Sequence, residues 1–471
     1  MTRRLLLFLL LSADCFSQSS LILQNPTDAP INPNPWLEAE DPSRTKSERQ
    51  AHPPNAPLPQ MPATPSPMRI SVSDAETLAL RNNPQITQMR LLALASHQAT
   101  RVARSSLWPT AAVDLTGVDS AENSRISAGG LNNPIIYERA ATGATVNQLI
   151  TDFGHTTNLI ASARLNEQSE MQNAVATEEQ VRLAVDQAFY GMLQARAVLK
   201  VAQETVNARQ SLSDRVTALA KSKLKSDLDV SFANVNLAQA RLLLLDAQNN
   251  EQSAMASLSA ILGYSSMQAF DLVENSQPVA SPPSNIDALI TDALARRPEL
   301  IALNYKYLSQ EKLYAADRDQ LLPTISALGA VGVAPVRNDH LSNWYGAVGV
   351  NVEVPIFNGF RFSAQAHESE LQAQAIQQQY ADLRNRVVRD VRTAWLSANT
   401  AFSRLDVSHQ LLSQANQALD LAQTRYNLGL GSIVELSQAQ LQQTQAQIED
   451  AQAGYDYRLA LAVLRYQVAE R

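Results

Sequence analysis

Residues 421–446 read LAQTRYNLGLGSIVELSQAQLQQTQA, which predicts a helix, a tight turn and a second helix. Apolar residues before the turn are spaced by three and four, as in a coiled-coil seam: Leu412, Ala415, Leu419, Ala422 and Tyr426. Gly429 and Gly431 allow the left-handed backbone that a chain reversal requires. Ser432 is expected to cap the returning helix, and Glu435, three residues later, to complete a capping box.

The same pattern occurs once more, in residues 218–240, which read ALAKSKLKSDLDVSFANVNLAQA. At this offset of 206 residues, three pairs of positions correspond: Asp152 and Asn358, Phe189 and Trp395, and Asp229 and Glu435. A second offset, 214, relates Pro84 to Pro298. The chain therefore contains an internal duplication. The difference between the offsets requires an insertion between residues 109 and 152, which we expect in the loop 120–138.

Two stretches without proline, residues 135–277 and 356–471, leave room for long helices, because proline breaks helix interiors. Within them, apolar residues keep the three-and-four spacing over residues 155–221 and 361–427. A helix of this length extends for about 100 Å, which is too long for a globular core. The sequence therefore predicts one long helix in each half.

Four shorter helical segments are expected: residues 73–106, 227–262, 286–320 and 432–468. The first begins with Ser73 as its N-cap and Glu76 closing a capping box, and it is interrupted at Asn83-Pro84. The second and third segments together match the length of the long helix, so we expect them to stack end to end beside it. By pseudo-symmetry, the fourth segment is expected to stack against the first.

The strands are expected within residues 109–154 and 323–359, where most of the glycines lie. Four are predicted: residues 109–118, 142–150, 324–333 and 345–356. The last alternates most clearly, and its apolar face comprises Val348, Val350, Val352, Val354 and Ile356. Asn351 and Glu353 lie on the opposite, polar face and are expected to line a water-filled lumen.

This strand pattern suits a membrane β-barrel with lipid outside and water inside. Aromatic residues lie near the strand ends, as in the interfacial girdles of such barrels: Trp108, Tyr137, Trp344 and Tyr345. Four strands cannot close a barrel, and an open sheet edge is excluded from lipid. Several chains would therefore share one barrel. The alternative is a soluble β-sandwich that caps a helical bundle.

Residues 1–17 read MTRRLLLFLLLSADCFS, a basic pair followed by an apolar run, which predicts a secretory signal. A membrane anchor, the alternative, needs about 18 apolar residues, and this run is shorter. Cys15 is a candidate lipidation site because the preceding residues resemble a lipobox except at Asp14; ordinary cleavage near Ser17 is the alternative. Residues 18–68 are rich in proline and are expected to be extended or disordered, or to wrap around a partner subunit.

Charge and motif content argue against several other functions. The net charge of -7 is unsuited to a nucleic-acid groove. A single cysteine excludes a disulfide framework, and the six histidines show no metal-ligand spacing. No nucleophile elbow or phosphate loop is present. The sequence therefore predicts no enzyme, metal site or cofactor.

Over residues 71–471 the chain resembles the TolC-like outer-membrane efflux protein family. The resemblance is carried by ITDFG at residues 150–154 and IFNG at 356–359, where strands meet helices, and by RYNLG at 425–429 in the second turn. It implies a mainly α-helical protein with two efflux repeats, residues 69–275 and 285–471, after the signal and the proline-rich segment.

The family resemblance further implies a homotrimer. Its strands, four from each chain, would form one twelve-strand barrel in the outer membrane of a Gram-negative-type bacterium. Its helices would form a tunnel across the periplasm. Such a protein is the exit duct of a tripartite efflux or type I secretion system, and it docks an inner-membrane transporter through a periplasmic adaptor. A structural or adhesive coiled-coil envelope protein without channel activity is the alternative.

Two kinds of functional site are implied by the same resemblance. Adaptor docking is expected at the turns, at Lys223, Leu224, Gly429, Leu430, Gly431 and Ser432. A periplasmic gate is expected at Tyr426, Asp229 and Glu435, with Lys223 or Lys225 supplying positive charge. The first turn departs from the family pattern, because Lys223 stands where the second turn has Gly429, so docking is expected mainly at the second turn.

Overall fold

The structure is a computed structural model that describes residues 68–118, 125–128, 131–135, 139–274, 280–334 and 342–470. The chain divides into two units, Met1–Pro65 and Ser66–Arg471, and all described residues belong to the second. The predicted signal, Cys15, nearly all of the proline-rich segment and Tyr137 lie outside the described residues.

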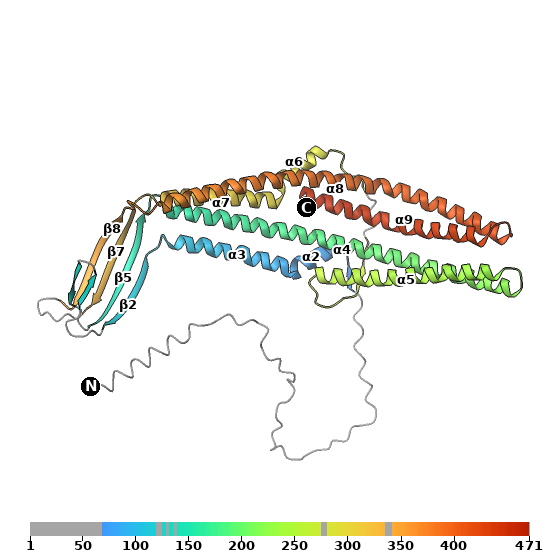
Figure 1. Ribbon diagram of the computed structural model, residues 1–471, viewed down its shortest axis with the longest axis horizontal. Coiled ribbons are helices and arrows are strands. Elements are labelled where there is room, and N and C mark those ends of the chain that lie inside the picture. Colours follow the sequence, from blue (N-terminus) through green and yellow to red (C-terminus); the bar gives the residue numbers. More distant parts are fainter. Residues whose placement is uncertain are drawn as a thin grey trace, which may run out of the picture. The chain divides into compact units, whose positions relative to one another are not determined.

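The second unit contains two copies of one set of helices (Figure 1). The long helices are α4 (His155–Lys221) and α8 (Arg361–Asn427), each with the predicted 67 residues. The returning helices are α5 (Asp227–Ile261) and α9 (Ile433–Val468). The remaining pairs are α2 (Val72–Asn82) with α6 (Ile286–Arg296), and α3 (Pro84–Ser105) with α7 (Pro298–Asp319). The predicted duplication is confirmed, because the members of each of these two pairs have equal lengths.

The shorter helices stack in a different order from the predicted one. Asn83, the N-cap of α3, donates a hydrogen bond from Nδ2 to the carbonyl of Ile261 at the end of α5, at 3.0 Å. Arg297, the N-cap of α7, donates to the Gln467 side chain near the end of α9, at 2.8 Å. Thus α5 meets α3 and α9 meets α7. The prediction was wrong because it treated residues 286–320 as one helix, whereas Pro298 divides them.

Two helix caps also differ from the predictions. Ser71, not Ser73, caps α2, and Asp74 rather than Glu76 completes the capping box. The sequence offered both Ser-x-x-acid pairs, two residues apart, so the pattern alone could not choose between them. At α9, Ser432 accepts from the Glu435 backbone N–H at 3.1 Å as predicted, but the Glu435 carboxylate pairs with Arg425 instead of returning to the cap.

Four antiparallel strands form a sheet in the order β2-β5-β7-β8 at one end of the long helices (Figure 1). They are β2 (Thr110–Val118), β5 (Arg139–Thr151), β7 (Thr324–Val333) and β8 (Trp344–Glu353). The four predicted strands are confirmed, but β8 ends before Val354 and Ile356. Pro355 follows closely, and it has no N–H to donate to a neighbouring strand.

Four shorter strands were not predicted. β3 (Arg125–Ala128) and β4 (Leu131–Ile135) form an antiparallel pair within the loop where the insertion was expected. β1 (Met68–Ile70) and β6 (Phe270–Leu272) form a parallel pair midway along the helices.

The register of the four-stranded sheet separates an apolar face from a polar one. Val350 lies opposite Ala327 and Val352 opposite Ile325, while Asn351 lies opposite Ser326. Successive side chains along a strand point to opposite faces of the sheet, and directly paired residues share a face. Val350 and Val352 therefore lie on one face together with their partners, and Asn351 lies on the other face with Ser326. The apolar face carries Val113, Leu115, Val146, Val331, Val348, Val350 and Val352, all exposed in the single chain. An apolar face this extensive requires a cover of lipid or protein.

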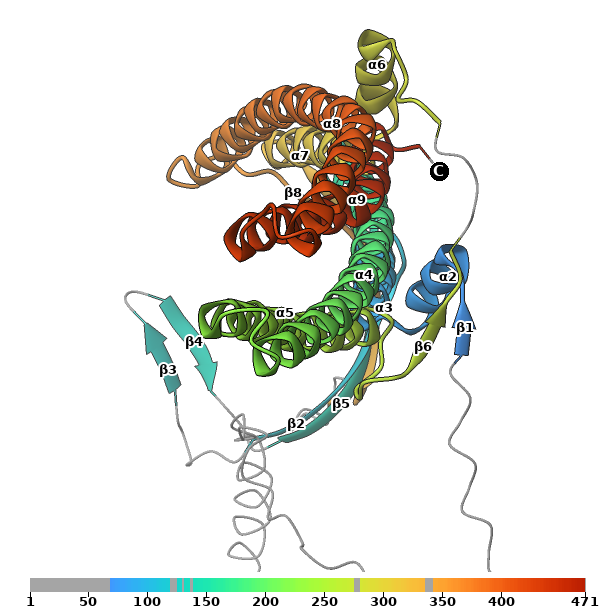
Figure 2. The same ribbon diagram turned by 90° about the vertical axis from the view of Figure 1, so that its right-hand side faces the viewer.

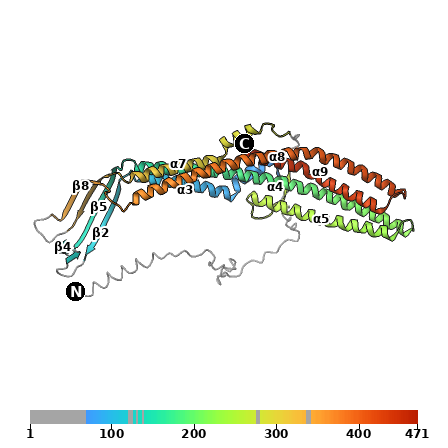
Figure 3. The ribbon, with the colours of Figure 1, turned by 45° about the horizontal axis from the view of Figure 1, so that its top comes forward.

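The helices form a curved layer when viewed along their length (Figure 2). In the part next to the sheet, packing contacts run from α3 to α4, then to α7 and then to α8. In the part next to the turns, they run from α5 to α4, then to α9 and then to α8 (Figure 3). No helix in the described ranges is long and apolar enough to cross a membrane.

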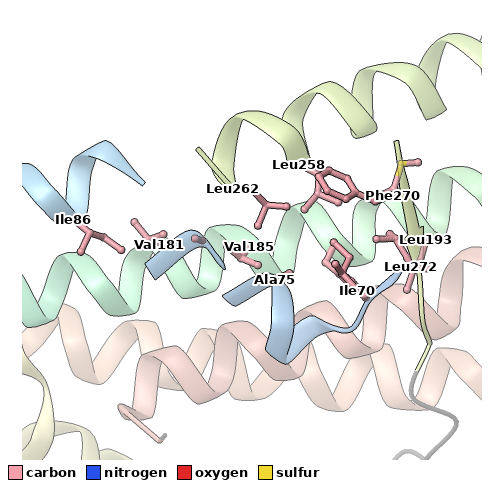
Figure 4. Packing of buried hydrophobic residues seen from close by; sticks show 13 residues of the cluster. Ile70, Ala75, Ile86, Val181, Val185, Leu193, Leu258, Leu262, Phe270 and Leu272 are labelled. Carbon is pink, nitrogen blue, oxygen red and sulfur yellow. The ribbon is translucent and has the colours of Figure 1, made fainter. Parts of the chain in front are cut away.

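Midway along the layer, β1, β6 and α2 cover α4 and α5 with an apolar cluster (Figure 4). Its members include Ile70, Val185, Leu193, Leu258, Phe270 and Leu272. This cluster gives the chain a compact core between the sheet and the turns.

A carboxylate pair lies next to this core, between α4 and α2. Burial and then the nearby charge of Glu76 raise the pKa of Asp186 to about 7, against the opposing effect of Arg465 and Arg182. Asp186 Oδ1 and Arg182 Nε are buried without a hydrogen-bond partner in the described part of the chain. Since an unfolded Asp has a pKa of about 3.9, the folded state holds an additional proton between about pH 4 and 7.

Asp186→Asn is therefore expected to change how stability depends on pH. In the wild-type protein, the contribution of Asp186 is most favourable below about pH 4 and is lost as the pH rises towards 7. The variant should raise the free energy of unfolding by about 2–4 kcal/mol at pH 8 and change it little at pH 4. Thermal midpoints across this range test the effect; an unchanged pH slope in the variant would refute it.

Candidate functional site

The two turns at the far end of the helices share one backbone conformation. At the second, Gly429 has φ 75° and donates to the carbonyl of Tyr426 at 3.2 Å. At the first, Lys223 has φ 59° and donates to the carbonyl of Ala220 at 2.9 Å. Gly431 has a different reason to be glycine, because a Cβ there would lie 3.2 Å from the Cβ of Arg425. Lys223 thus occupies the left-handed position that its counterpart fills with glycine.

Lys223→Gly is expected to stabilise the first turn. The left-handed conformation costs a residue with a Cβ about 1–2 kcal/mol, part of which glycine loses again through its greater freedom in the unfolded chain. The expected net gain in the free energy of unfolding is about 0.5–1 kcal/mol. Leu224→Gly is the control, since Leu224 does not have a positive φ, and it should destabilise. Equal effects of the two changes would contradict the assignment.

The predicted docking residues are accessible at both turns. Leu224 is 70% exposed, and Leu430 is 69% exposed, with Leu428 beside it similarly open. Gly429 has open space where a Cβ would be added. The exposed leucines at the ends of both hairpins are accessible to a partner protein.

The predicted gate residues Tyr426 and Asp229 meet between the two hairpins. Tyr426 is 3% exposed, and its hydroxyl donates to Asp229 Oδ1 at 3.5 Å. Lys225 Nζ lies 3.7 Å from the centre of the Tyr426 ring and 3.4 Å from the Tyr426 carbonyl oxygen. This cluster connects the α4–α5 hairpin to the α8–α9 hairpin at their tips.

Burial and contacts within this cluster shift two pKa values. Burial, and then the charge of Asp229, raise the pKa of Tyr426 to about 12, so the phenol stays a donor. Burial opposes ionisation of Asp229, but hydrogen bonds from Ser226, with help from Lys225 and Tyr426, hold its pKa below the ordinary value. Asp229 also completes the capping box of α5 with Ser226. The cluster therefore pairs an ionised acceptor with a protonated donor at neutral pH.

The third predicted gate residue is placed elsewhere. Glu435 is partly exposed and pairs with Arg425 Nε at 3.1 Å, within the second hairpin. Lys225, rather than Lys223, supplies the positive charge at Tyr426. Arg425 was not predicted as a site residue, although its position directly before Tyr426 places it on the turn. No group of three or more potential metal ligands occurs among the described residues.

The described residues combine a four-stranded sheet that has an exposed apolar face with two helical hairpins, each of which contains one helix of 67 residues. This combination fits the class of outer-membrane proteins, in which lipid covers the apolar face. Comparisons with known proteins agree. The family described as outer membrane efflux protein matches residues 77–264 and 289–468. The chain therefore belongs to the outer membrane efflux protein family, whose two matched stretches fall in the two halves of the duplication. It is an outer-membrane transport protein and not an enzyme.

Individual relatives cover most of the chain. Outer membrane protein TolC of Vibrio cholerae serotype O1 is 24% identical over 410 residues, which cover 83% of this chain and 88% of TolC. TolC of Escherichia coli strain K12 is 24% identical over 412 residues, covering 82% and 81%. A crystal structure of a membrane protein from Pseudomonas aeruginosa has a TM-score of 0.74 at 20% identity, covering 84% of this chain and 93% of that protein.

Proposed function

We propose that three copies of this chain form a continuous duct through which compounds leave the periplasm across the outer membrane. The proposed partners are a periplasmic adaptor, which would dock at the exposed turn residues, and an inner-membrane transporter. The observation that carries the proposal is an unequal use of equivalent helix faces in the two halves. The number three comes from the resemblance to TolC-like proteins.

Helix α7 buries a face that its repeat counterpart α3 leaves open. Ala316 on α7 is 0% exposed against α4, whereas its counterpart Val102 on α3 is 70% exposed. Ser309 on α7 is 6% exposed, and its counterpart Ala95 is exposed. On α8, the counterpart of α4, an open groove is lined by Ala364, His367, Glu368, Leu371, Gln372 and Ala375. Each chain thus presents one unfilled groove and one uncovered helix face.

Placing α3 of one copy on α8 of the next repeats the α7–α4 contact that exists within the chain. The same operation brings the free edges of β2 and β8 together, which repeats the β5–β7 pairing. Such a head-to-tail contact uses two different surfaces and closes into a ring when the rotation is right. Three copies would give a barrel of twelve strands without an open edge, with Asn351 and Glu353 on its inner face.

A disulfide cross-link tests this arrangement. Ser162 Oγ lies 3.0 Å from Ser309 Oγ where α4 meets α7, and the counterparts of these residues are Glu368 and Ala95. Ala95→Cys combined with Glu368→Cys, in a Cys15→Ser background, should cross-link neighbouring copies and yield a covalent species of three chains. Gln98→Cys with Glu368→Cys is the control, because the counterpart of Gln98, Lys312, is exposed. Equal cross-linking in both pairs, or none in an assembled protein, would argue against the ring.

The cluster of Tyr426, Asp229 and Lys225 at the hairpin tips is the proposed gate of the duct. Loss of the Tyr426 hydroxyl and of the Lys225 charge should free the hairpins, so Tyr426→Phe with Lys225→Met is expected to raise single-channel conductance. Partly buried hydrogen bonds of this kind contribute about 0.5–1.5 kcal/mol each, and three copies add them around one axis. Glu435→Gln is the matched control, because the Glu435–Arg425 pair lies within one hairpin. If Glu435→Gln raises conductance as much as the double variant, the gate is not at Tyr426.

A further inference from the structure

Arg209 is a buried arginine in the middle of the helical layer, on α4. The residue is only 7% exposed. Nη2 donates hydrogen bonds to the carbonyl oxygen of Gln440 at 2.8 Å and to Thr444 Oγ1 at 3.0 Å, both on α9. Both acceptors are neutral, so they satisfy hydrogen bonds without balancing the charge.

The positive charge of Arg209 has no counter-ion in the described part of the chain. Burial lowers the pKa of Arg209 to about 10, so the guanidinium remains protonated at neutral pH. Glu204 and Glu449 line the neighbouring cavities, but neither comes within ion-pair distance of it among the described contacts. A buried charge without a partner is costly, which makes the site favourable for an anion.

A groove beside Arg209 has the size and lining of a small-molecule site. It lies between α5 and α9 with α4 as its floor, and it has a volume of 580 Å³, within the usual range of about 300–1,000 Å³ for ligand pockets. Aliphatic side chains line it: Ala240, Leu243, Leu441 and Ile448. Polar side chains complete the lining, among them Asn236, Gln239, Ser437, Thr444, Gln445 and Gln452. One buried cationic group beside a strip of aliphatic side chains matches a ligand with an anionic head and an apolar tail.

We propose that this groove binds an amphiphilic organic monoanion, with its carboxylate on Arg209 and its aliphatic chain along Leu243, Leu441 and Ile448. Both hydrogens of Nη2 are directed to α9, so neither two-bond fork of the guanidinium is free, and the carboxylate is held by a single charge-assisted hydrogen bond from Nε or Nη1. The exposed carboxylate of Glu449 at the groove disfavours ligands with more than one negative charge. The site lies within one chain, so it does not depend on the proposed number of copies.

The duplication supplies an internal comparison. The residue on α8 that corresponds to Arg209 is Ala415, which is buried. The second half therefore has no cation at the equivalent position, and the proposal assigns one anion site to each chain. The charge is a property of the first half only, so it is not needed to build the repeated helix packing.

Equilibrium dialysis with three probes tests the proposal on the purified protein in a neutral detergent. Octanoate should bind with about one molecule per chain, while acetate, which lacks the tail, and 1-octanol, which lacks the charge, should bind at least tenfold more weakly. Arg209→Met keeps the length of the side chain and should weaken octanoate at least tenfold without changing 1-octanol.

A second variant keeps the test decisive if Arg209→Met does not assemble. Leu441→Asp places a carboxylate in the groove, on an exposed position next to Gln440, and should abolish octanoate binding in a folded protein. Equal binding of octanoate and 1-octanol would show detergent-like partitioning and overturn the proposal. Unchanged octanoate binding in either folded variant would overturn it as well.

Discussion

Val350→Arg is expected to prevent assembly in the outer membrane, whereas Asn351→Arg should assemble normally. The two residues are neighbours on β8, but the register with β7 places them on opposite faces of the sheet. Val350 shares its face with Val348, Val352 and Val331, and all four are exposed in the single chain. An arginine on the lipid face of a barrel costs about 2–4 kcal/mol near the midplane. Because every copy carries the change, the cost is repeated around the barrel.

Heat-resistant oligomers in outer-membrane fractions provide the measurement for this pair. We expect their loss in Val350→Arg and their wild-type level in Asn351→Arg, which should also shift ion selectivity towards anions, because the polar face lines the proposed lumen. Equal assembly of both variants, or equal failure, would mean that the two faces of the sheet are assigned wrongly.

Val102→Asp is expected to separate the copies while leaving each chain folded. In the single chain Val102 is exposed, so a carboxylate there is solvated. In the proposed ring it would be covered by α8 of the neighbouring copy, as its counterpart Ala316 is covered by α4. An uncompensated buried charge costs about 3–5 kcal/mol, and a ring of three contains the contact three times.

The mass of the detergent-solubilised protein shows whether this separation occurs. Gln98→Asp introduces the same carboxylate on the same helix, at a position whose counterpart Lys312 is exposed, and it should keep the oligomer intact. If Val102→Asp remains fully assembled, α3 does not form the interface.

The starts of the long helices were predictable because a glycine lies at each of them, whereas the end of α4, which no glycine or proline marks, followed from the duplication. Gly154 precedes α4 and Gly359 lies just before α8, while proline is absent from both helices. The strands were predictable because they lie in glycine-rich windows, although the last one was predicted to run through Pro355, before which β8 ends. Both signals are local, and local signals are what a single sequence expresses most directly.

The packing order and the charge pairs were not predictable in the same way. The stacking of α5 on α3 depends on a contact between Asn83 and Ile261, which are far apart in the sequence. Lys225 and Lys223 are equally basic, and only the turn geometry selects Lys225 for Tyr426. Arg209 belongs to no motif, because its unpaired charge is visible only when its neighbours on α9 are known.

Single-channel conductance of the purified protein in planar lipid bilayers tests the central claim most directly. A duct shared by three copies predicts discrete conductance steps from the oligomer, larger steps from Tyr426→Phe with Lys225→Met, and none from Val350→Arg. A stable oligomer that inserts into the bilayer without conducting, in both the wild type and the tip variant, would contradict the account and favour a structural envelope protein.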